Sequence, residues 1–187
     1  MRFFVALATL LLLGACDQAA PSSSSSVFVG AALAETASPA IAEIRAATAP
    51  YRRVGNAVAA GYEEASPCVA LPADDGTELA AMGYHYLNEG LLFDGVIDPA
   101  APELLLYEPT PNGTLRLVGV EFMIAADAWD GDEPPTFEGV PFAVHLTPDV
   151  QHGIPFPHYD LHVWTWERNP DGMFAPFNAA VSCANAL

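Results

Sequence analysis

From Met82 onward the chain alternates between short apolar runs, rich in β-branched and aromatic residues, and clusters of Gly, Pro, Asn and Asp. This pattern predicts short strands joined by turns. Five segments fit it, at residues 82–88, 103–108, 114–125, 142–146 and 159–167. Asn112-Gly113 lies between the second and the third, and Asn-Gly favours the positive φ angles of a tight hairpin turn. We therefore expect a mostly antiparallel β-sheet in this part of the chain.

The segment before these strands has helical periodicity. Ser38 is suited to cap a helix that begins at Pro39, because proline is tolerated at the first helical position. Apolar residues then recur at helical spacing, at Ile41, Ile44, Tyr51, Val58 and Tyr62. Pro50 interrupts the pattern, which predicts a kink or two helices, the second ending before Ser66-Pro67. The predicted fold class is α+β, with an N-terminal helix or kinked helix pair packed on a mostly antiparallel β-sheet, either open or curled.

The N-terminus has the form of an export signal. Arg2 supplies a positive charge, and residues 3–13 form an uncharged apolar run that is too short for a stable transmembrane helix. The run ends in Leu13-Gly14-Ala15-Cys16, which resembles the lipobox of bacterial lipoproteins. The resemblance implies that residues 1–15 are removed as a signal peptide and that Cys16 carries the lipid anchor. An ordinary secretory signal with a chance cysteine at the cleavage site is the alternative.

The segment after Cys16 predicts a tether. Residues 17–26 read DQAAPSSSSS, which has too little apolar surface to offset the entropy of ordering it. We expect residues 16–38 to form a lipidated N-terminus and flexible tether, and residues 39–187 to form a single globular domain. The lipoprotein resemblance places the protein in the cell envelope, held to a membrane by the lipid on Cys16 and facing the periplasm or the exterior.

Cysteines occur at three positions, 16, 68 and 183. With Cys16 lipidated, Cys68 and Cys183 remain as an even pair in an oxidising compartment, which predicts a disulfide between them. In the chain-entropy model, closing a loop of this length contributes on the order of 4 to 5 kcal/mol. Two free thiols are the alternative, and neither cysteine lies in a redox or zinc motif such as C-x-x-C.

The charge of the chain excludes several functions. Its six basic residues are all arginine and face 23 acidic residues, so the formal net charge is −17. Such a surface repels nucleic acid. The lack of lysine excludes both a Schiff-base lysine and a P-loop lysine. One loop concentrates four acids, Asp127, Asp130, Asp132 and Glu133. We interpret it as a solvated loop rather than a Ca²⁺ site, because it lacks the regular ligand spacing.

Six short segments stand out among the predicted strands and turns. They are MGYHYLN at 82–88, LYEP at 106–109, LVGVE at 117–121, LHVW at 161–164, NPDGMF at 169–174 and VSC at 181–183. Together they resemble a family of exported bacterial proteins of unknown function. The resemblance spans most of residues 62–183 and implies a single exported domain. It implies no activity and no catalytic residue.

Histidine is the residue type most suggestive of chemistry. Only five are present, and three lie in or beside predicted strands that are rich in aromatic residues, namely His85, His158 and His162. His158 and His162 would be about 13 Å apart along a strand, which is too far for them to share one metal ion. His85 and His162 would become cross-strand neighbours if their two strands paired.

Glu121 has an unusual setting for a carboxylate, since simple alternation places it on a strand face with Leu115, Leu117 and Met123. One hypothesis is that His85, Glu121 and His162 converge in one pocket and bind a small ligand or a transition metal such as zinc or copper. The alternative is that each has ordinary structural partners: a carbonyl for His85, Trp164 and Trp166 for His162, and a backbone amide, Arg116 or Arg168 for Glu121.

Three function classes remain open, and the chain contains none of the common hydrolase, zinc-protease, dinucleotide or EF-hand motifs. The sequence favours a membrane-anchored small-ligand or metal-binding domain of unknown activity. One alternative is a structural or partner-binding envelope lipoprotein, and another is a metal-dependent hydrolase that uses metal-bound water. Residues 133–141, Phe174 and Phe177 are the candidate surface for an envelope protein partner, unless they simply cover the core.

Overall fold

The structure is a computed structural model and describes residues 38–148 and 154–186, which belong to one compact unit spanning Thr36–Leu187. The predicted signal peptide, Cys16 and the tether as far as residue 37 lie outside the described residues. Within the two described ranges, no helix is long and apolar enough to cross a membrane.

Two short helices and a 3₁₀ turn precede the sheet: α1 (Pro39–Thr48), η1 (Ala49–Arg52) and α2 (Val54–Ala59). Ser38 caps α1, because its hydroxyl accepts a hydrogen bond from the Ile41 amide at 3.2 Å. Pro50 lies at the start of η1, where it interrupts the regular helix. The two-helix form of the predicted N-terminal region is therefore confirmed.

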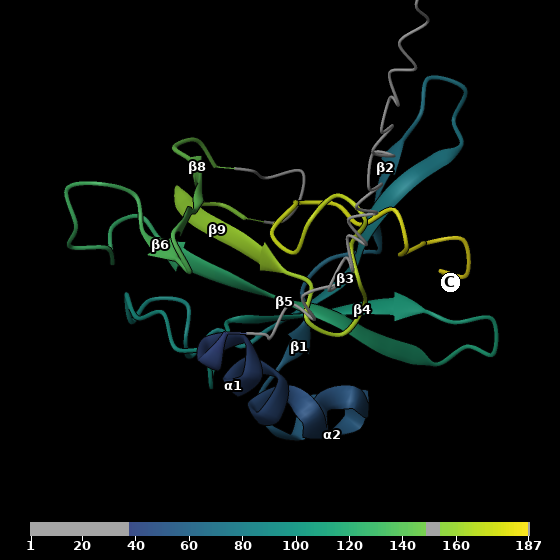
Figure 1. Cartoon of the computed structure of the whole chain (residues 1–187), viewed down its shortest axis with the longest axis horizontal. Helices are drawn as coiled ribbons and strands as arrows, with labels where there is room; N and C mark the ends of the chain where they lie inside the picture. Colours follow the sequence, from purple (N-terminus) through teal and green to yellow (C-terminus); the bar gives the residue numbers. More distant parts are fainter. Residues whose placement is uncertain (1–37, 149–153, 187) are drawn as a thin grey trace, which may run out of the picture. The chain divides into compact units, whose positions relative to one another are not determined.

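A seven-stranded sheet follows, and all of its strand pairs are antiparallel. Its strands run in the order β1-β3-β4-β5-β9-β8, with β2 paired to β3 (Figure 1). The bounds are β1 Glu63–Glu64, β2 Val69–Pro72, β3 Glu78–Leu87, β4 Leu104–Pro109, β5 Leu115–Ala125, β8 Ala143–His145 and β9 His158–Val163. A separate two-stranded sheet pairs β6 (Thr136–Phe137) with β7 (Val140–Pro141). The predicted α+β class with a mostly antiparallel sheet is confirmed.

The predicted strands differ from the structure at their ends. The sequence pattern does not predict β1, β2, β6 or β7, which are each two to four residues long. The last strand, β9, ends at Val163 rather than at residue 167. It stops because the Trp164 amide donates instead to the carbonyl of Met173, at 2.9 Å, in the C-terminal segment.

One face of the sheet packs against the helices and forms the main core, and we call it the helix face (Figure 1). Alternate residues of the central strands point to it, including Leu105 on β4, Val120 and Phe122 on β5, and Leu161 on β9. Ile44 of α1 packs against them and is fully buried. Burying one large apolar side chain contributes about 1.5–3 kcal/mol, so this face is the main source of hydrophobic stabilisation.

An irregularity in the pairing of β4 with β5 changes which residues of β5 share a face, and it lies beside Gly119. Leu117 packs in the helix-face core, and Leu115 packs against it. Glu121 and Met123 line a cavity on the other face. The prediction that Glu121 shares a face with Leu115 and Leu117 is therefore wrong, because simple alternation does not hold across a β-bulge.

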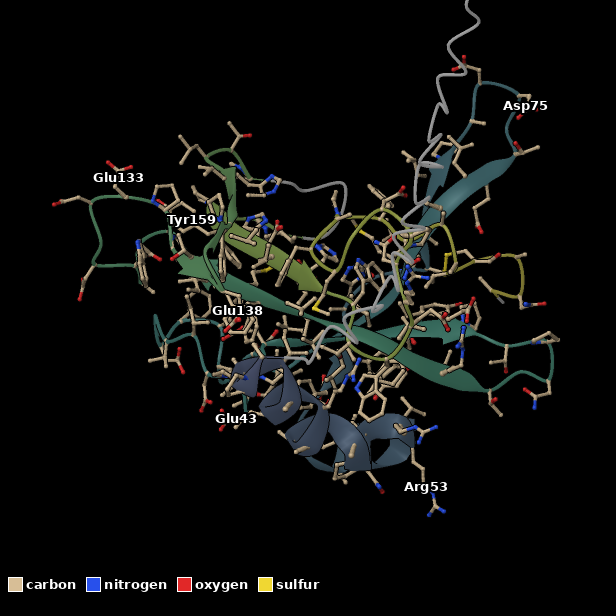
Figure 2. The ribbon with its side chains drawn as sticks, viewed as in Figure 1. Glu43, Arg53, Asp75, Glu133, Glu138 and Tyr159 are labelled. Carbon is tan, nitrogen blue, oxygen red and sulfur yellow. A yellow bond between two sulfur atoms is a disulfide. The ribbon has the colours of Figure 1, made fainter. Side chains whose placement is uncertain are left out.

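The acidic loop follows β5. Its four acids, Asp127, Asp130, Asp132 and Glu133, are all exposed, and Glu133 projects away from the sheet (Figure 2). The Trp129 indole donates to the Glu133 carbonyl at 2.8 Å, which links the two ends of the loop. No close group of three potential metal ligands within the described residues includes any of these acids.

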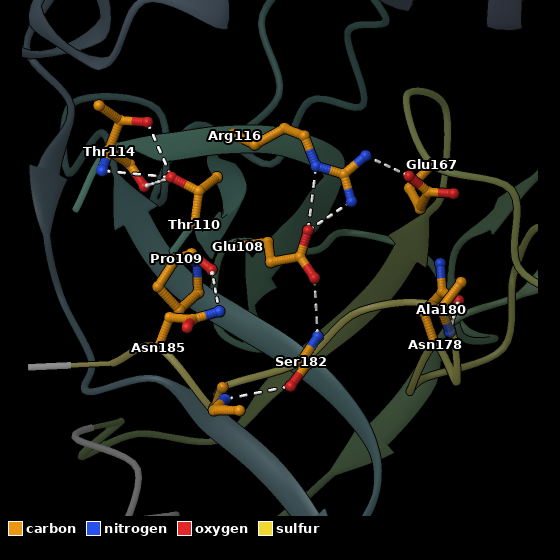
Figure 3. Close-up of polar contacts among 12 residues, drawn as sticks. Glu108, Pro109, Thr110, Thr114, Arg116, Glu167, Asn178, Ala180, Ser182 and Asn185 are labelled. Atoms are coloured by element: carbon orange, nitrogen blue, oxygen red, sulfur yellow. Dashed lines mark hydrogen bonds and ion pairs between the residues drawn. The ribbon is translucent and has the colours of Figure 1, made fainter. Parts of the chain in front are cut away.

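The C-terminal segment that follows β9 packs across the face opposite the helices. Asn178 and Ala81 of β3 exchange two backbone hydrogen bonds, of 3.0 and 3.1 Å. The Glu108 carboxylate on β4 accepts a hydrogen bond from the Ser182 amide at 3.0 Å and forms an ion pair with Arg116 (Figure 3). The segment is therefore fixed to the sheet at two separate strands.

A disulfide joins the same segment to the start of β2. Cys183 is bonded to Cys68, which lies 115 residues earlier, so the predicted pairing is confirmed. The Cys183 amide also donates to the Glu78 carboxylate on β3 at 2.9 Å. Because this segment covers part of one sheet face, its attachment helps to form the cavity on that face.

Candidate metal centre

The face opposite the helices bears histidines and acids that line a cavity of about 700 Å³. We call it the histidine face, and it is defined by His85 on β3, Glu121 on β5, His145 on β8, and His158, Asp160 and His162 on β9. The rest of the cavity wall is mainly apolar and includes Leu104, Met123, Phe156 and Phe177. The polar groups are thus concentrated within an apolar chamber.

Strand register brings part of this cluster together. Glu121 pairs directly with His162 across β5 and β9. His85 lies on β3, which does not pair with β9, because β4 and β5 lie between them. Three strand spacings correspond to about 14 Å. The two imidazoles nevertheless meet edge-on, with ring centroids 6.0 Å apart.

His85, Glu121 and His162 form the first cluster, so the structure brings these three predicted residues together. Glu121 Oε2 lies 3.4 Å from His85 Nε2 and 3.8 Å from His162 Nε2. One potential ligand atom from each residue lies within 4.8 Å of the other two. In a tetrahedral zinc site the ligand atoms are about 3.3–3.6 Å apart, so only a small closure is needed to reach metal-binding geometry.

Two polar atoms at the centre of this cluster are buried without a hydrogen-bond partner among the described residues. They are Glu121 Oε2 and His162 Nε2. The two residues are only 3 % and 4 % exposed. A buried polar atom left unpaired costs about 1–3 kcal/mol. The pair therefore needs a further partner, and a cation would satisfy both atoms at once.

The residues expected to neutralise Glu121 have other partners. Arg116 forms ion pairs with Glu108 and Glu167 on the surface. Arg168 is exposed. The backbone amide of Met123, two residues after Glu121 on β5, donates to a different buried acid, Glu103, at 3.1 Å. The ordinary structural partners proposed for Glu121 are thus not the ones that the structure provides.

The two imidazoles are positioned by neighbours outside the cluster. Ser66 Oγ lies 2.9 Å from His85 Nδ1 and 2.9 Å from the Pro67 carbonyl, and it also accepts from the His85 amide at 3.3 Å. If the Ser66 hydroxyl donates its single proton to the Pro67 carbonyl, His85 Nδ1–H donates to Ser66 Oγ. The lone pair of His85 Nε2 then faces Glu121. The His162 ring stacks on Trp164 with centroids 6.2 Å apart. Trp166, the other expected neighbour, instead donates to Thr48 Oγ1 at 3.0 Å.

Burial controls the protonation of this cluster. It raises the pKa of Glu121 well above its ordinary value, and the negative charges of Asp160 and Glu103 raise it further. Burial also lowers the pKa of His162 to about 4, so this imidazole is neutral at pH 7. A neutral imidazole is the form that binds a metal, whereas the carboxyl group has to lose its proton when a cation binds.

Sequence reasoning missed a second cluster on the same face, formed by His145, His158 and Asp160. His145 pairs directly with His158 across β8 and β9, and Asp160 follows two residues along β9. His158 and His162 belong to different clusters, as their spacing along a strand predicts. The sequence does show that His158, Asp160 and His162 alternate along one strand and so share a face. It does not show that His145 pairs with this strand.

Part of the predicted partner surface lies in the interior, while most of residues 133–141 are exposed or half-buried, so the envelope protein partner stays a prediction. Phe137, within residues 133–141, is buried against Phe122 with ring centroids 5.0 Å apart. Phe174 is half-buried and contacts Phe137 at 6.4 Å, while Phe177 lines the cavity. All three aromatic residues therefore have a structural role in covering the core or the cavity.

Comparison of this chain with protein families, with curated proteins and with solved structures finds no match. Its function therefore has to be inferred from the chemistry of the histidine face.

Proposed function

We propose that this protein binds a divalent transition-metal ion through His85, Glu121 and His162. The observation that supports the proposal is the pair of buried, unpaired atoms, Glu121 Oε2 and His162 Nε2, 3.8 Å apart. Two facing buried polar atoms without a hydrogen-bond partner are unfavourable, and a cation that replaces the carboxyl proton would contact both of them.

The ligand set favours zinc or copper. Two imidazole nitrogens and one carboxylate oxygen suit borderline metals such as these, whereas Ca²⁺ and Mg²⁺ are bound by oxygen ligands. Three protein ligands leave at least one coordination position for water or for a donor atom of a small molecule. The apolar cavity wall, with Leu104 and Phe156, suits a small ligand that has an apolar body and one metal-binding group.

We further propose that the domain is held to a membrane of the cell envelope by a lipid on Cys16. The lipobox resemblance of residues 13–16 and the uncharged run before it support this proposal. Fractionation of cells that express the C16S variant tests it. The variant should be lost from the membrane fraction, and unchanged membrane association would overturn the lipid anchor.

Zinc affinity of the full chain tests the metal site. Competition between the protein and a fluorescent zinc chelator should show a binding step at this site whose affinity falls at least ~100-fold in both E121Q and H162A, since each removes one of its three ligands. E89Q is the matched control, because Glu89 is an exposed acid that lines the same cavity outside the cluster. Its zinc affinity should equal that of the wild type.

Two results would contradict the proposed site. One is a wild-type protein that does not compete for zinc at micromolar concentrations. The other is zinc binding that persists unchanged in both E121Q and H162A, which would place the ion elsewhere. Thermal unfolding of each variant by circular dichroism shows whether a loss of binding reflects a loss of fold.

A further inference from the structure

We propose that His145, His158 and Asp160 form a second transition-metal site on the wall of the same cavity. The two imidazoles converge on one carboxylate oxygen. Asp160 Oδ2 lies 2.8 Å from His145 Nε2 and 3.6 Å from His158 Nε2. One potential ligand atom from each of the three residues lies within 4.8 Å of the other two, which is the same spacing as in the first cluster.

The β8–β9 pairing produces this arrangement. His145 and His158 are direct cross-strand partners, and their rings stack with centroids 4.7 Å apart and an angle of 14° between planes. Asp160 points to the same face because it lies two residues along β9. Its cross-strand partners are Ala143 on β8 and Met123 on β5. All ligands thus come from one pair of strands, with no need for distant segments to meet.

A neighbouring carbonyl orients the buried imidazole. His158 Nδ1 lies 3.1 Å from the Phe156 carbonyl oxygen, which can only accept, so Nδ1 carries the proton. In the neutral ring the lone pair is then on Nε2, the atom that faces Asp160. A histidine that donates its other ring nitrogen to a carbonyl is the usual support of a metal ligand. The histidine side chain is 2 % exposed, so the carbonyl holds it within a packed wall.

Access differs between the two clusters. The His145 side chain is 42 % exposed, whereas those of His85 and His162 are 11 % and 5 % exposed. The second cluster therefore reaches solvent directly through His145. An ion that arrives at the cavity meets His145 without displacing packed side chains.

The two clusters share no residue. His162 belongs to the first and Asp160 to the second, and the backbone positions of residues two apart on a strand are about 7 Å apart. We infer two mononuclear sites that share no ligand, so that either site can bind an ion without the other.

The number of zinc ions bound per full chain tests the second site. Zinc is titrated into a mixture of a fluorescent chelator and the protein, for the wild type and for H145A, D160N and H162A. The wild type should bind two Zn²⁺ per chain, and each of the three variants should bind one. H145A should leave the affinity of the remaining site within about threefold. L146A is the control for disturbance of the end of β8, because Leu146 is exposed and offers no ligand atom.

Three outcomes would overturn this second site, and a fourth would overturn the first. If H145A and D160N still bind two zinc ions, the cluster is an ion-pair network without a metal. A wild type that binds one ion, lost only in H162A, leaves the first site standing and removes the second. One ion lost in both H145A and H162A would mean a single shared site. One ion lost only in H145A and D160N would instead overturn the first site, and the second would then stand alone.

Discussion

The two faces of the sheet are built from the same strands but have opposite energetic characters. Along β5, Val120, Phe122 and Ile124 point to the helix face, whereas Glu121 and Met123 point to the histidine face. The first set is apolar and almost fully buried, and every contact in it is favourable. Adjacent residues of one strand therefore serve stability on one side and ligand chemistry on the other.

The histidine face carries a cost that the helix face does not. A buried carboxyl group and a buried imidazole without partners each reduce stability by about 1–3 kcal/mol. The helix face must offset this cost, and it does so with large apolar side chains. Residues that lower stability yet occupy the centre of a cavity are therefore the best indication of function in this chain.

The largest expected effect comes from neighbouring residues on the two faces. Phe122→Ala should lower the free energy of unfolding by about 3–5 kcal/mol, because it leaves a void in the helix-face core. Glu121→Gln, one residue away, should leave it unchanged or raise it in metal-free protein, since the amide is neutral without having to keep a proton as the buried carboxyl group does. Urea unfolding of both variants measures the contrast, and equal losses would contradict the division of roles.

The next effect concerns the closure of the cavity. Replacing both Cys68 and Cys183 by serine should reduce stability by about 2–4 kcal/mol. Amide exchange in residues 176–183 should increase more than exchange in α1, because these residues are attached to the strands near the disulfide and not to α1. Hydrogen exchange with mass spectrometry tests this, and a uniform increase in both regions would count against it.

A third effect is the pH dependence of stability that comes from the buried acid Glu103. Burial raises the pKa of Glu103 from 4.5 to about 8, and the negative charges of Asp94 and Asp98 add to the rise. Hydrogen bonds from backbone amides, including that of Met123, partly oppose it. The folded protein then keeps a proton that the unfolded chain loses. The resulting stability is complete below pH 4.5 and is lost as the pH rises towards 8.

The Glu103→Gln variant should remove this dependence. Its free energy of unfolding relative to wild type should increase between pH 5 and pH 8.5, by on the order of 4 kcal/mol. Denaturant unfolding at several pH values gives the two curves. Parallel curves over this range would show that Glu103 ionises in the folded protein as easily as in water.

The smallest effect is expected from the exposed acidic loop. Glu133→Gln should change stability by less than about 0.5 kcal/mol, because the side chain projects into solvent. It should also leave zinc affinity unchanged. Calorimetry and the chelator competition measure both quantities, and a clear loss of zinc binding would move attention from the cavity to this loop.

Local signals in the sequence predicted much of the fold. The capping residue and Pro50 predicted the helix pair, and the apolar runs predicted the positions of β3, β4, β5 and β9. Counting cysteines predicted the disulfide, although the premise that Cys16 is lipidated lies outside the described residues. Each of these signals acts within a few residues or follows from a count, which is why one sequence is enough to detect it.

The remaining features depend on contacts that are distant in the sequence. The bulge at Gly119 reverses the faces of Leu117 and Glu121, and no local pattern marks it. The order of strands separates His85 and His162 along the sheet, yet their rings lie 6.0 Å apart. The pairing of His145 with His158 depends on a connection whose length does not fix a register, so the second cluster was not predictable.

The central claim is that the buried first cluster holds a metal ion, and anomalous X-ray scattering from crystals of the full chain grown with Zn²⁺ tests it most directly. We predict a zinc peak about 2.0–2.2 Å from His85 Nε2, His162 Nε2 and a Glu121 oxygen. The same crystals of the E121Q variant should lose that peak. A peak that is absent from the wild type, or that lies away from these three side chains, would contradict the claim.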